Sequence, residues 1–516
     1  MENNIFTPEA FGAAADGIHN DNAAIAAAIK AAAECSGTVK FGKNKVYYVK
    51  DGVPTPGGNA VMYLNNADGV SIIGENSVIR TGEVLAYFNF FASRNIVLKG
   101  FIFETQPHCA FRGRLVSVNN EKVSAIIKTD TEPEFANDFY KYYDYEKVNA
   151  HPYSFAIPDS QWREHLFLRR IDRISPKTYE VWFATDFATR NALRYVGENR
   201  CDIIMPTPRM SHAGCAVLIH GCANVHIEDC NIKEAPQFVC AVKGNQGDIY
   251  FDNVKMCCES DQEIPTVGWR DGYHCKDNRG AIHWKNCDIG RLYDDAFNIS
   301  CTCLYVDAQP DENTLSLKNF ENNGVYYSVR KGDALSVYDT FEGKIHSEYN
   351  RVKRVIKQCG AELLIELENP ISEVDFKHTR VMFDSLSAPG STVENCRVYG
   401  TVRMRGPITV RNTDFNLLMM WFENEDHIEG PVPRDMLFEN CRFKGTYPVT
   451  DRYLENYLSF RTVKAWPGVP EYKLKNIKLS NCCLDSRFTY VEENNDVMFE
   501  NCCELEGKHR KIPERL

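Results

Sequence analysis

A short phrase recurs along the chain and constrains its fold more than any other feature of the sequence. The phrase reads apolar, polar, Asn or Asp, Cys, polar and then usually apolar. Copies with Cys occupy 227–232, 284–289, 393–398, 438–443, 479–484 and 499–504, and copies without it occupy 251–256 and 410–415. Alternating apolar residues predict short strands with one buried face. The central Asn or Asp tolerates the left-handed backbone of a sharp bend.

The spacing of the phrase predicts how these strands are arranged. Its central Asn or Asp stands at 229, 253, 286, 395, 412, 440, 481 and 501, with gaps of 24, 33, 109, 17, 28, 41 and 20 residues. Apart from the gap of 109, these are lengths of one coil in a parallel β-solenoid. We therefore expect an all-β parallel β-helix, with ladders of Asn and Cys side chains stacked about 4.8 Å apart inside the bends.

Two stretches without the phrase indicate insertions. Residues 111–205 and 301–380 contain alternating strands with turn signals, which predict two antiparallel β modules inserted into solenoid turns. The modules are expected either to close a groove or to make a homodimer contact. The solenoid coils then fall in 1–110, 206–300 and 381–516.

The first of these parts contains a predicted helix. Residues 21–37 are rich in Ala, with Asp21 as a candidate N-cap and Gly37 at the end. An open solenoid end exposes a sheet edge and an apolar core, so we expect this helix to cap the first coil.

Composition excludes several classes of partner. The net charge of −11 argues against a nucleic-acid partner, whose phosphates need a basic face. No stretch approaches 18 consecutive apolar residues, so no membrane span is predicted. The first residues do not read as a signal peptide, which predicts a cytoplasmic protein, or a secreted or periplasmic one if a leader has been removed. None of the 20 cysteines forms a C-x-x-C pair, and we expect most to be reduced and buried.

The stretch "RLYDDAFNIS" (291–300) places Asp294 and Asp295 side by side in an apolar frame. Asp271 stands 23 residues earlier, which is one coil, so we expect it beneath this pair on the same outer face. His274 and Asn298 follow on the same two strands. Clustered carboxylates shift each other's pKa values, so that one tends to hold a proton at neutral pH. A protonated acid beside an ionised partner is what cleavage of a glycosidic bond requires.

The same residues also have interpretations that involve no catalysis. An isolated Asp-Asp pair is usually a solvated turn. His274 is equally consistent with a hydrogen-bonded structural histidine, and Asn298 with a residue that caps a bend. A carboxylate cluster also suits Ca²⁺. The third Asp at coil spacing favours catalysis, with no metal or organic cofactor.

These motifs resemble those of a known enzyme family. Asp271-x-x-His274, followed after 19 residues by Asp294-Asp295-Ala-x-Asn298, resembles the Asp-x-x-His and Asp-Asp-Ala-x-Asn motifs of the family 110 glycoside hydrolases. Members of that family are inverting exo-α-galactosidases built on a right-handed parallel β-helix. The motifs are also similar to the Thr-Asp-Gly and Gly-Asp-Asp pair of the polygalacturonase clan, which stand about one coil apart.

Other segments extend the likeness over nearly the whole chain. "VRMRGPITV" (402–410) is similar to the Arg-x-Arg-Gly strand of family 110, and "MWFEN" (420–424) to its Trp-Phe-Glu segment. Residues 10–29 resemble the opening of many β-helix carbohydrate enzymes. The two inserted modules fall where the family carries β-barrel insertions.

The resemblance implies a role for each matching residue. Asp294 would be the general acid, and Asp271 and Asp295 would hold and activate the water. The substrate-binding residues would be His274, Asn298, Arg403, Arg405, Trp421 and Glu423. The chain departs from the family where Ser300 and Cys301 replace a His-Gly pair, which concerns the sugar more than the reaction.

Three functions follow as hypotheses. The first is an inverting exo-glycosidase that acts on a terminal α-linked galactose, or a similar sugar, of an oligosaccharide or glycan. Its acid and base carboxyls should lie about 6.5–9.5 Å apart, whereas a retaining pair would be near 5 Å. The second is a uronate-specific polysaccharide lyase, in which Arg270, Lys276 and Arg279 hold a substrate carboxylate. The third is a non-catalytic carbohydrate-binding β-solenoid, because a fold does not fix a function.

Overall fold

The structure is a computed structural model of the chain. It describes residues 4–82, 85–106, 110–119, 121–122, 124–130, 132, 154–155, 166–183, 202–206, 214–235, 238–256, 267–268, 270–290, 292, 294–319, 329–359, 362–422, 429–444, 458–462, 471–493 and 495–505. Within the described residues, no helix combines the length and the hydropathy needed to cross a membrane.

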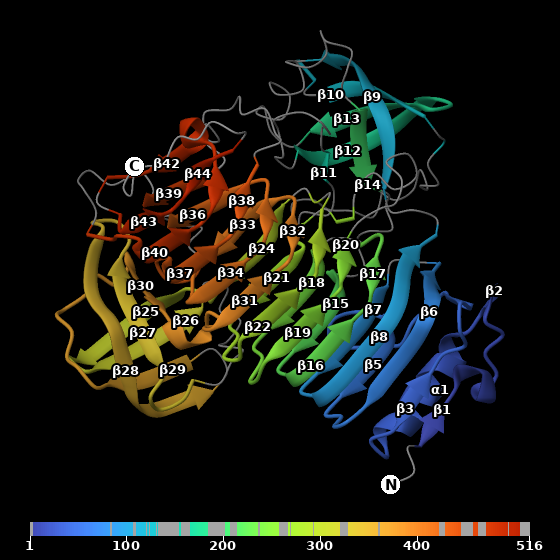
Figure 1. The fold of residues 1–516 in the computed structure, drawn as a ribbon, viewed down its shortest axis with the longest axis horizontal. Helices are drawn as coiled ribbons and strands as arrows, with labels where there is room; N and C mark the ends of the chain where they lie inside the picture. Colours follow the sequence, from blue (N-terminus) through green and yellow to red (C-terminus); the bar gives the residue numbers. More distant parts are fainter. Residues whose placement is uncertain are drawn as a thin grey trace.

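Parallel strands stacked rung on rung form the body of the molecule, which confirms the predicted all-β parallel β-helix (Figure 1). The largest sheet has 22 strands. They are β1 (Ile5–Phe6), β2 (Asp16–Asn20), β3 (Thr38–Lys40), β4 (Val46–Val49), β6 (Ser71–Thr81), β8 (Arg94–Thr105), β16 (Ala223–Glu228), β17 (Asn231–Ile232), β19 (Ile249–Asp252), β20 (Lys255–Met256), β22 (Ile282–Lys285), β23 (Asp288–Ile289), β31 (Ser391–Glu394), β32 (Arg397–Val398), β34 (Ile408–Arg411), β35 (Asp414–Phe415), β37 (Arg434–Glu439), β38 (Arg442–Phe443), β40 (Lys475–Ser480), β41 (Cys483–Leu484), β43 (Val497–Glu500) and β44 (Cys503–Glu504).

A second parallel sheet runs along another side of the solenoid and carries the candidate site. Its strands, in spatial order, are β33 (Thr401–Met404), β24 (Asp295–Ser300), β21 (Tyr273–Lys276), β18 (Phe238–Lys243), β15 (Cys215–His220), β7 (Ala86–Phe91) and β5 (Ala60–Asn65). A three-stranded parallel sheet packs next to β33 through its first strand. It consists of β36 (Leu418–Phe422), β39 (Leu458–Thr462) and β42 (Thr489–Val491).

The repeat phrase forms the bends of the solenoid. All eight of its central Asn and Asp residues have φ between 50° and 55°, the left-handed region that the sequence predicted. The Cys that follows in six copies is buried against the core. The Asn and Asp side chains, however, are exposed on the outside of the bends, so the expected internal Asn ladder is wrong. Side chains of this set form hydrogen bonds between neighbouring rungs on the exposed surface. For example, Asn253 Nδ2 donates to Asp229 Oδ1 at 2.8 Å.

The capping helix is confirmed, although it ends earlier than predicted. Helix α1 (Asn22–Ala33) lies at the N-terminal end of the solenoid beside β1 and β3 (Figure 1). Asp21 occupies the N-cap position, as predicted, but its carboxylate accepts from the backbone N–H of Ala14 at 2.7 Å and makes no capping hydrogen bond. The helix ends at Ala33, before the predicted Gly37, and the residue with a left-handed backbone after it is Ser36, at φ 52°. Short 3-10 helices occur at η1 (Pro8–Phe11), η4 (Asp384–Leu386) and η5 (Ser486–Phe488).

Two antiparallel modules interrupt the coils (Figure 1). The first is a six-stranded sheet of β9 (Ala110–Asn119), β10 (Ser124–Thr129), β11 (Ser154–Phe155), β12 (Leu166–Ser175), β13 (Thr178–Phe183) and β14 (Asp202–Pro206). The second is a closed barrel of β25 (Leu304–Asp311), β26 (Thr314–Asn319), β27 (Ala334–Asp339), β28 (Lys344–Cys359), β29 (Glu362–Leu367) and β30 (Thr379–Met382). A buried ion pair between Arg434 of β37 and Asp384 ties the solenoid to the segment after the barrel.

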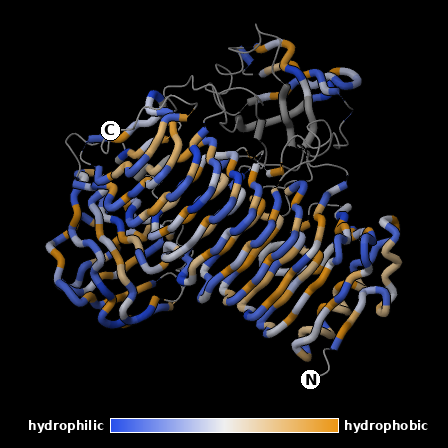
Figure 2. Tube along the Cα trace, in the orientation of Figure 1, coloured by the Kyte–Doolittle hydropathy of each residue, from blue (hydrophilic) through white to orange (hydrophobic). Residues whose placement is uncertain are grey.

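Side chains along each strand of the second sheet point alternately into the core and outward, and this decides which residues face the site. The alternation of hydropathy along the rungs is visible in Figure 2. Tyr273 and Phe297 point into the core from β21 and β24, where their rings stack with centroids 5.5 Å apart. The residues that follow them, His274 and Asn298, are register partners on the outer side. Arg403 of β33 is the next register partner in that row. Polar side chains of three neighbouring rungs are thereby brought together.

Candidate active site

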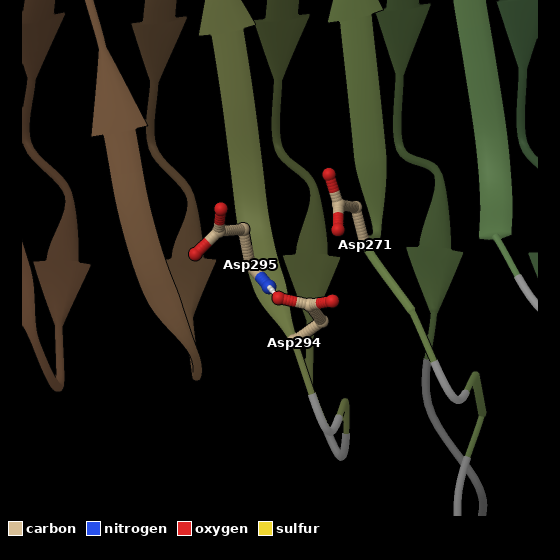
Figure 3. A group of neighbouring side chains, drawn as sticks. All are labelled: Asp271, Asp294 and Asp295. Carbon is tan, nitrogen blue, oxygen red and sulfur yellow. Dashed lines mark hydrogen bonds between the residues drawn. The ribbon is translucent and has the colours of Figure 1, made fainter. Parts of the chain in front are cut away.

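Three aspartates converge where strands β21 and β24 begin (Figure 3). Asp271 precedes β21, Asp294 precedes β24, and Asp295 is the first residue of β24. One carboxyl oxygen from each lies within 4.8 Å of the others. The register between the strands is 24 residues, because Tyr273 pairs with Phe297. Asp271 is therefore level with Asp295, so this coil has 24 residues and not the 23 counted to Asp294, and the three acids meet as expected.

The three carboxyl groups differ in their access to solvent. The side chains of Asp271 and Asp295 are each 4% exposed, whereas that of Asp294 is 26% exposed. A substrate that enters from solvent therefore reaches Asp294 most easily. The other two acids form the floor of the cluster.

Burial and mutual repulsion favour the protonated forms of the two floor acids. Burial and the nearby Asp294 and Asp295 carboxylates raise the pKa of Asp271 well above its usual 3.8. Burial also raises the pKa of Asp295 to about 6, with the Arg403 guanidinium opposing this rise. Because the carboxyl groups interact closely, their protonation is shared by the cluster, and burial favours a proton on it.

Asp271 is held by a histidine on its own strand. His274 Nδ1 lies 2.7 Å from Asp271 Oδ2. Burial, together with the Lys276 and Lys243 ammonium groups, lowers the pKa of His274 well below 6.5, so the imidazole is neutral. The Phe238 ring packs on the imidazole with centroids 4.7 Å apart and fixes its orientation.

Asp295 is held by residues of the neighbouring strand β33 and of its own strand β24. Its Oδ1 accepts a hydrogen bond from the Thr401 hydroxyl of β33. Its Oδ2 lies 3.0 Å from Arg403 Nε and accepts from Asn298 Nδ2 at 3.3 Å. Three donors therefore aim at one buried carboxylate, and they oppose the rise of its pKa that burial causes.

Asp294 has a looser environment than the floor acids. Its Oδ1 accepts from the backbone N–H of Asp295 at 3.0 Å. Its Oδ2 lies 3.4 Å from Nε of Arg270, whose guanidinium rests over the Phe238 ring at 5.2 Å from the centroid. A backbone hydrogen bond thus holds one oxygen of this partly exposed acid in place.

The residues predicted to bind substrate fall into three groups. His274, Asn298 and Arg403 contact the cluster directly. Arg405 is 1% exposed and lies under Gly430, where an added Cβ would be 2.8 Å from Arg405 Cγ. Its burial does not favour the predicted sugar contact. The backbone of Trp421 belongs to β36, and Glu423 lies outside the described residues.

A fourth carboxylate, Glu429, was not predicted. Its Oε1 lies 2.8 Å from Lys276 Nζ, and its Oε2 accepts from Asn298 Nδ2 at 2.7 Å. Burial alone would raise the pKa of Glu429, but the Lys276 and Arg403 cations outweigh burial and hold this pKa well below 4.5. No repeat phrase surrounds it, and it is 131 residues from Asn298 in sequence. Sequence spacing therefore offered no signal for this contact.

The aspartate cluster also has the composition of a cation site. Its three acids could each offer one oxygen to a metal ion. Ca²⁺ prefers six to eight oxygen ligands. Here Arg270 and Arg403 already lie against two of the three carboxylates, and two of the acids favour protonation. The surroundings thus favour acid–base chemistry over ligation of a hard cation.

No family model matches the sequence, and no curated protein matches it either. Several solved structures are similar in outline. The A-module of mannuronan C-5 epimerase AlgE4 from Azotobacter vinelandii is 10% identical, with a TM-score of 0.37, over 97% of this chain and 78% of that one. An exopolygalacturonase from Thermotoga maritima is 10% identical, with a TM-score of 0.40, over 98% and 92%. The adhesin PfbA of Streptococcus pneumoniae is 11% identical, with a TM-score of 0.31, over 97% and 84%.

A fold does not by itself select among chemistries. The function of this chain has to be argued from the aspartate cluster and its neighbours.

Proposed function

We propose that the protein is a glycoside hydrolase that removes a terminal α-linked sugar, galactose or a close relative, from an oligosaccharide or glycan. One observation carries the proposal: Asp271, Asp294 and Asp295 meet within 4.8 Å on adjacent rungs, in surroundings that favour a proton on the cluster. Glycosidases need a carboxylic acid and a carboxylate at one site. The motif resemblance to family 110 supports the choice of galactose.

Access and hydrogen bonding support a division of roles. Asp294 is the most exposed of the three, so it is the group that can reach the leaving oxygen and protonate it. Asp295 has three donors that favour its carboxylate form, so it accepts the proton of the attacking water. Asp271 holds that water together with Asp295, and His274 fixes the position of Asp271.

The stereochemical course is part of the proposal. Nearest oxygens within 4.8 Å are closer than the about 6.5–9.5 Å expected between the carboxyls of an inverting pair. The spacing by itself therefore favours retention. We nevertheless propose inversion, because both oxygens of Asp295 already accept hydrogen bonds, and a pair of buried acids is suited to hold one water.

The alternative of a uronate lyase is less well supported by the contacts. Its three basic residues were expected to hold the carboxylate of a substrate. Instead, each one is paired with a carboxylate of the chain: Arg270 with Asp294, Lys276 with Glu429, and Arg279 with Asp333. A hydrolase that acts on a sugar without a carboxylate accounts for these pairs more simply.

The test is hydrolysis of 4-nitrophenyl α-galactoside and a panel of α- and β-linked oligosaccharides, with the first product followed by NMR. Release of the β-anomer from an α-linked sugar, absent in Asp294→Asn, would establish an inverting glycosidase. Release of the α-anomer would establish retention. An unsaturated product would identify a lyase. Sugar binding without turnover, unchanged in Asp294→Asn, would identify a binding solenoid.

A further inference from the structure

We infer that Glu429 is a specificity-determining residue, whose carboxylate takes the place beside Lys276 and Arg403 that a sugar carboxylate would need. The site would then accept neutral sugars and reject uronates. The inference rests on the proposed glycosidase function and deepens it. It is carried by the contacts of Lys276, by the anchoring of residue 429, and by the balance of charge around the cluster.

All three ammonium hydrogens of Lys276 have acceptors within the chain. Its Nζ lies 2.8 Å from Glu429 Oε1 and donates to Ser300 Oγ at 2.5 Å. A third, longer bond runs to Asn298 Oδ1 at 3.4 Å. A substrate carboxylate would have to displace one of these partners to reach this cation.

Glu429 is itself fully engaged on the side of the cluster. One oxygen faces Lys276, and the other accepts from Asn298 Nδ2 at 2.7 Å, with Arg403 Nη1 at 3.9 Å. The Lys276 and Glu429 side chains are only 12% and 17% exposed. An ion pair in such a poorly solvated place is costly to break, because either partner left alone would be a buried charge.

The backbone after Glu429 is fastened to the strand that carries Asn298. Gly430 has φ 70°, and its N–H donates to the carbonyl of Cys301 at 3.0 Å. A Cβ at Gly430 would lie 2.8 Å from Ser300 Cβ, so a side chain could not be added without displacing the segment. This close approach places residue 429 over the site as a built feature of the fold.

The charge balance explains why a uronate would be rejected. Four acidic side chains surround the site, and the cations against three of them are Arg270, Lys276 and Arg403. A further carboxylate on the sugar would add repulsion in a poorly solvated region. A neutral sugar instead offers hydroxyl groups, which can donate to remaining lone pairs of carboxylate oxygens.

The test compares two substrates that differ only at C6. These are 4-nitrophenyl α-galactoside, which has a CH₂OH group there, and 4-nitrophenyl α-galacturonide, which has a carboxylate. Wild type is expected to favour the galactoside by roughly 100-fold or more in kcat/KM. Glu429→Gln removes the charge at nearly constant shape and should shift this ratio at least about 10-fold toward the galacturonide. Glu429→Asp keeps the charge and should retain the preference for galactoside.

Glu394→Gln is the matched control. Glu394 lies on β31 in the largest sheet, where its neighbour is Arg411 at 3.8 Å, so its variant should leave the ratio unchanged. A wild type that cleaves the galacturonide as well as the galactoside would overturn the inference. So would an unchanged ratio in Glu429→Gln. If that variant does not fold, the kcat/KM ratio of the wild type and that of Glu429→Asp still test the inference.

Failure of the proposed hydrolysis would be recognised separately. If wild type cleaves neither glycoside, the glycosidase proposal fails, and binding of galactose and galacturonate is measured by calorimetry. Tighter binding of galactose, with galacturonate gaining at least about 10-fold in Glu429→Gln, would support the role of Glu429. Equal or tighter binding of galacturonate by wild type, or no binding of galactose, would overturn it.

Discussion

His274 Nδ1 lies 2.7 Å from Asp271 Oδ2 in a poorly solvated contact. Burial acts on the partners in opposite directions: it lowers the pKa of His274 and raises that of Asp271. Both shifts favour the uncharged form of the residue concerned. The pair therefore forms an uncharged part of the site floor, next to the charged groups Asp295 and Arg403.

This relationship predicts that Asp271→Asn stabilises the protein increasingly as pH rises. The raised pKa of Asp271 means that the folded chain keeps a proton that the unfolded chain releases above about pH 4. Its contribution to stability is complete below that pH and is lost as pH rises toward the folded pKa. Asn resembles the protonated acid and does not titrate. We expect a gain of roughly 1–2 kcal/mol at pH 8 and little at pH 4, measured by urea unfolding.

The control for that measurement is Asp68→Asn. Hydrogen bonds from Asn95 and Arg94 lower the pKa of Asp68, so its removal should not bring a gain that grows with pH. An effect of Asp271→Asn on stability that is independent of pH would contradict the raised pKa of Asp271 in the folded protein.

Asp294 is predicted to matter most for substrates with poor leaving groups. A general acid typically contributes about 10²–10⁴-fold, and an activated aryl leaving group needs little protonation. Asp294→Asn should therefore reduce kcat/KM by this amount for an α-linked disaccharide and by much less for a 2,4-dinitrophenyl glycoside. Equal losses with both substrates would show that Asp294 is not the acid. The same split in Asp271→Asn would assign the acid to Asp271.

Arg403 is predicted to set the acidic limb of the pH profile. Burial raises the pKa of Asp295 to about 6, and Arg403 limits this rise. If ionised Asp295 is the base, kcat/KM rises with pH through about 6 in wild type. Arg403→Met should move this limb to higher pH by roughly one unit or more. A limb that stays in place while activity falls would indicate that Arg403 acts on the substrate and not on Asp295.

The bends and the core could be predicted from the sequence because their determinants are local. Each repeat phrase carries its own left-handed residue and its own buried Cys, as at Asn286 and Cys287. The approximate position of the candidate site followed from the same coil spacing, since one coil separates Asp271 from the Asp294–Asp295 pair.

The remaining features depend on contacts between residues that are far apart in the sequence, and no local sequence pattern indicates these contacts. The register of 24 residues between β21 and β24 is set by which core residues stack, here Tyr273 on Phe297. Glu429 reaches Asn298 from 131 residues away, and Thr401 reaches Asp295 from 106 residues away. In a solenoid such residues become neighbours only after the inserted barrel has been looped out. The exposure of the Asn ladder likewise follows from the direction of the bend, which the phrase itself does not specify.

The cysteines are predicted to differ sharply in reactivity. Burial raises the pKa of Cys230 to about 12 and limits its thiolate. The repeat cysteines are at most 2% exposed, whereas Cys35, Cys359 and Cys503 are exposed. Brief alkylation of the native protein with iodoacetamide, followed by peptide mass spectrometry, should label these three before the repeat cysteines. Rapid native labelling of the repeat cysteines, with folding verified by circular dichroism, would contradict the buried ladder.

The left-handed bends are predicted to make substitution of Asn253 by Ala more destabilising than substitution by Gly. Asn253 has φ 52°, and its side chain donates to Asp229. Ala and Gly both remove that exposed hydrogen bond, but only Ala adds the steric cost of a left-handed Cβ, about 1–2 kcal/mol. Urea unfolding should therefore show Asn253→Ala to be less stable than Asn253→Gly by roughly this amount. Equal stability of the two variants would mean that the bend can relax out of the left-handed region, and that the phrase reports side-chain bonding instead of backbone conformation.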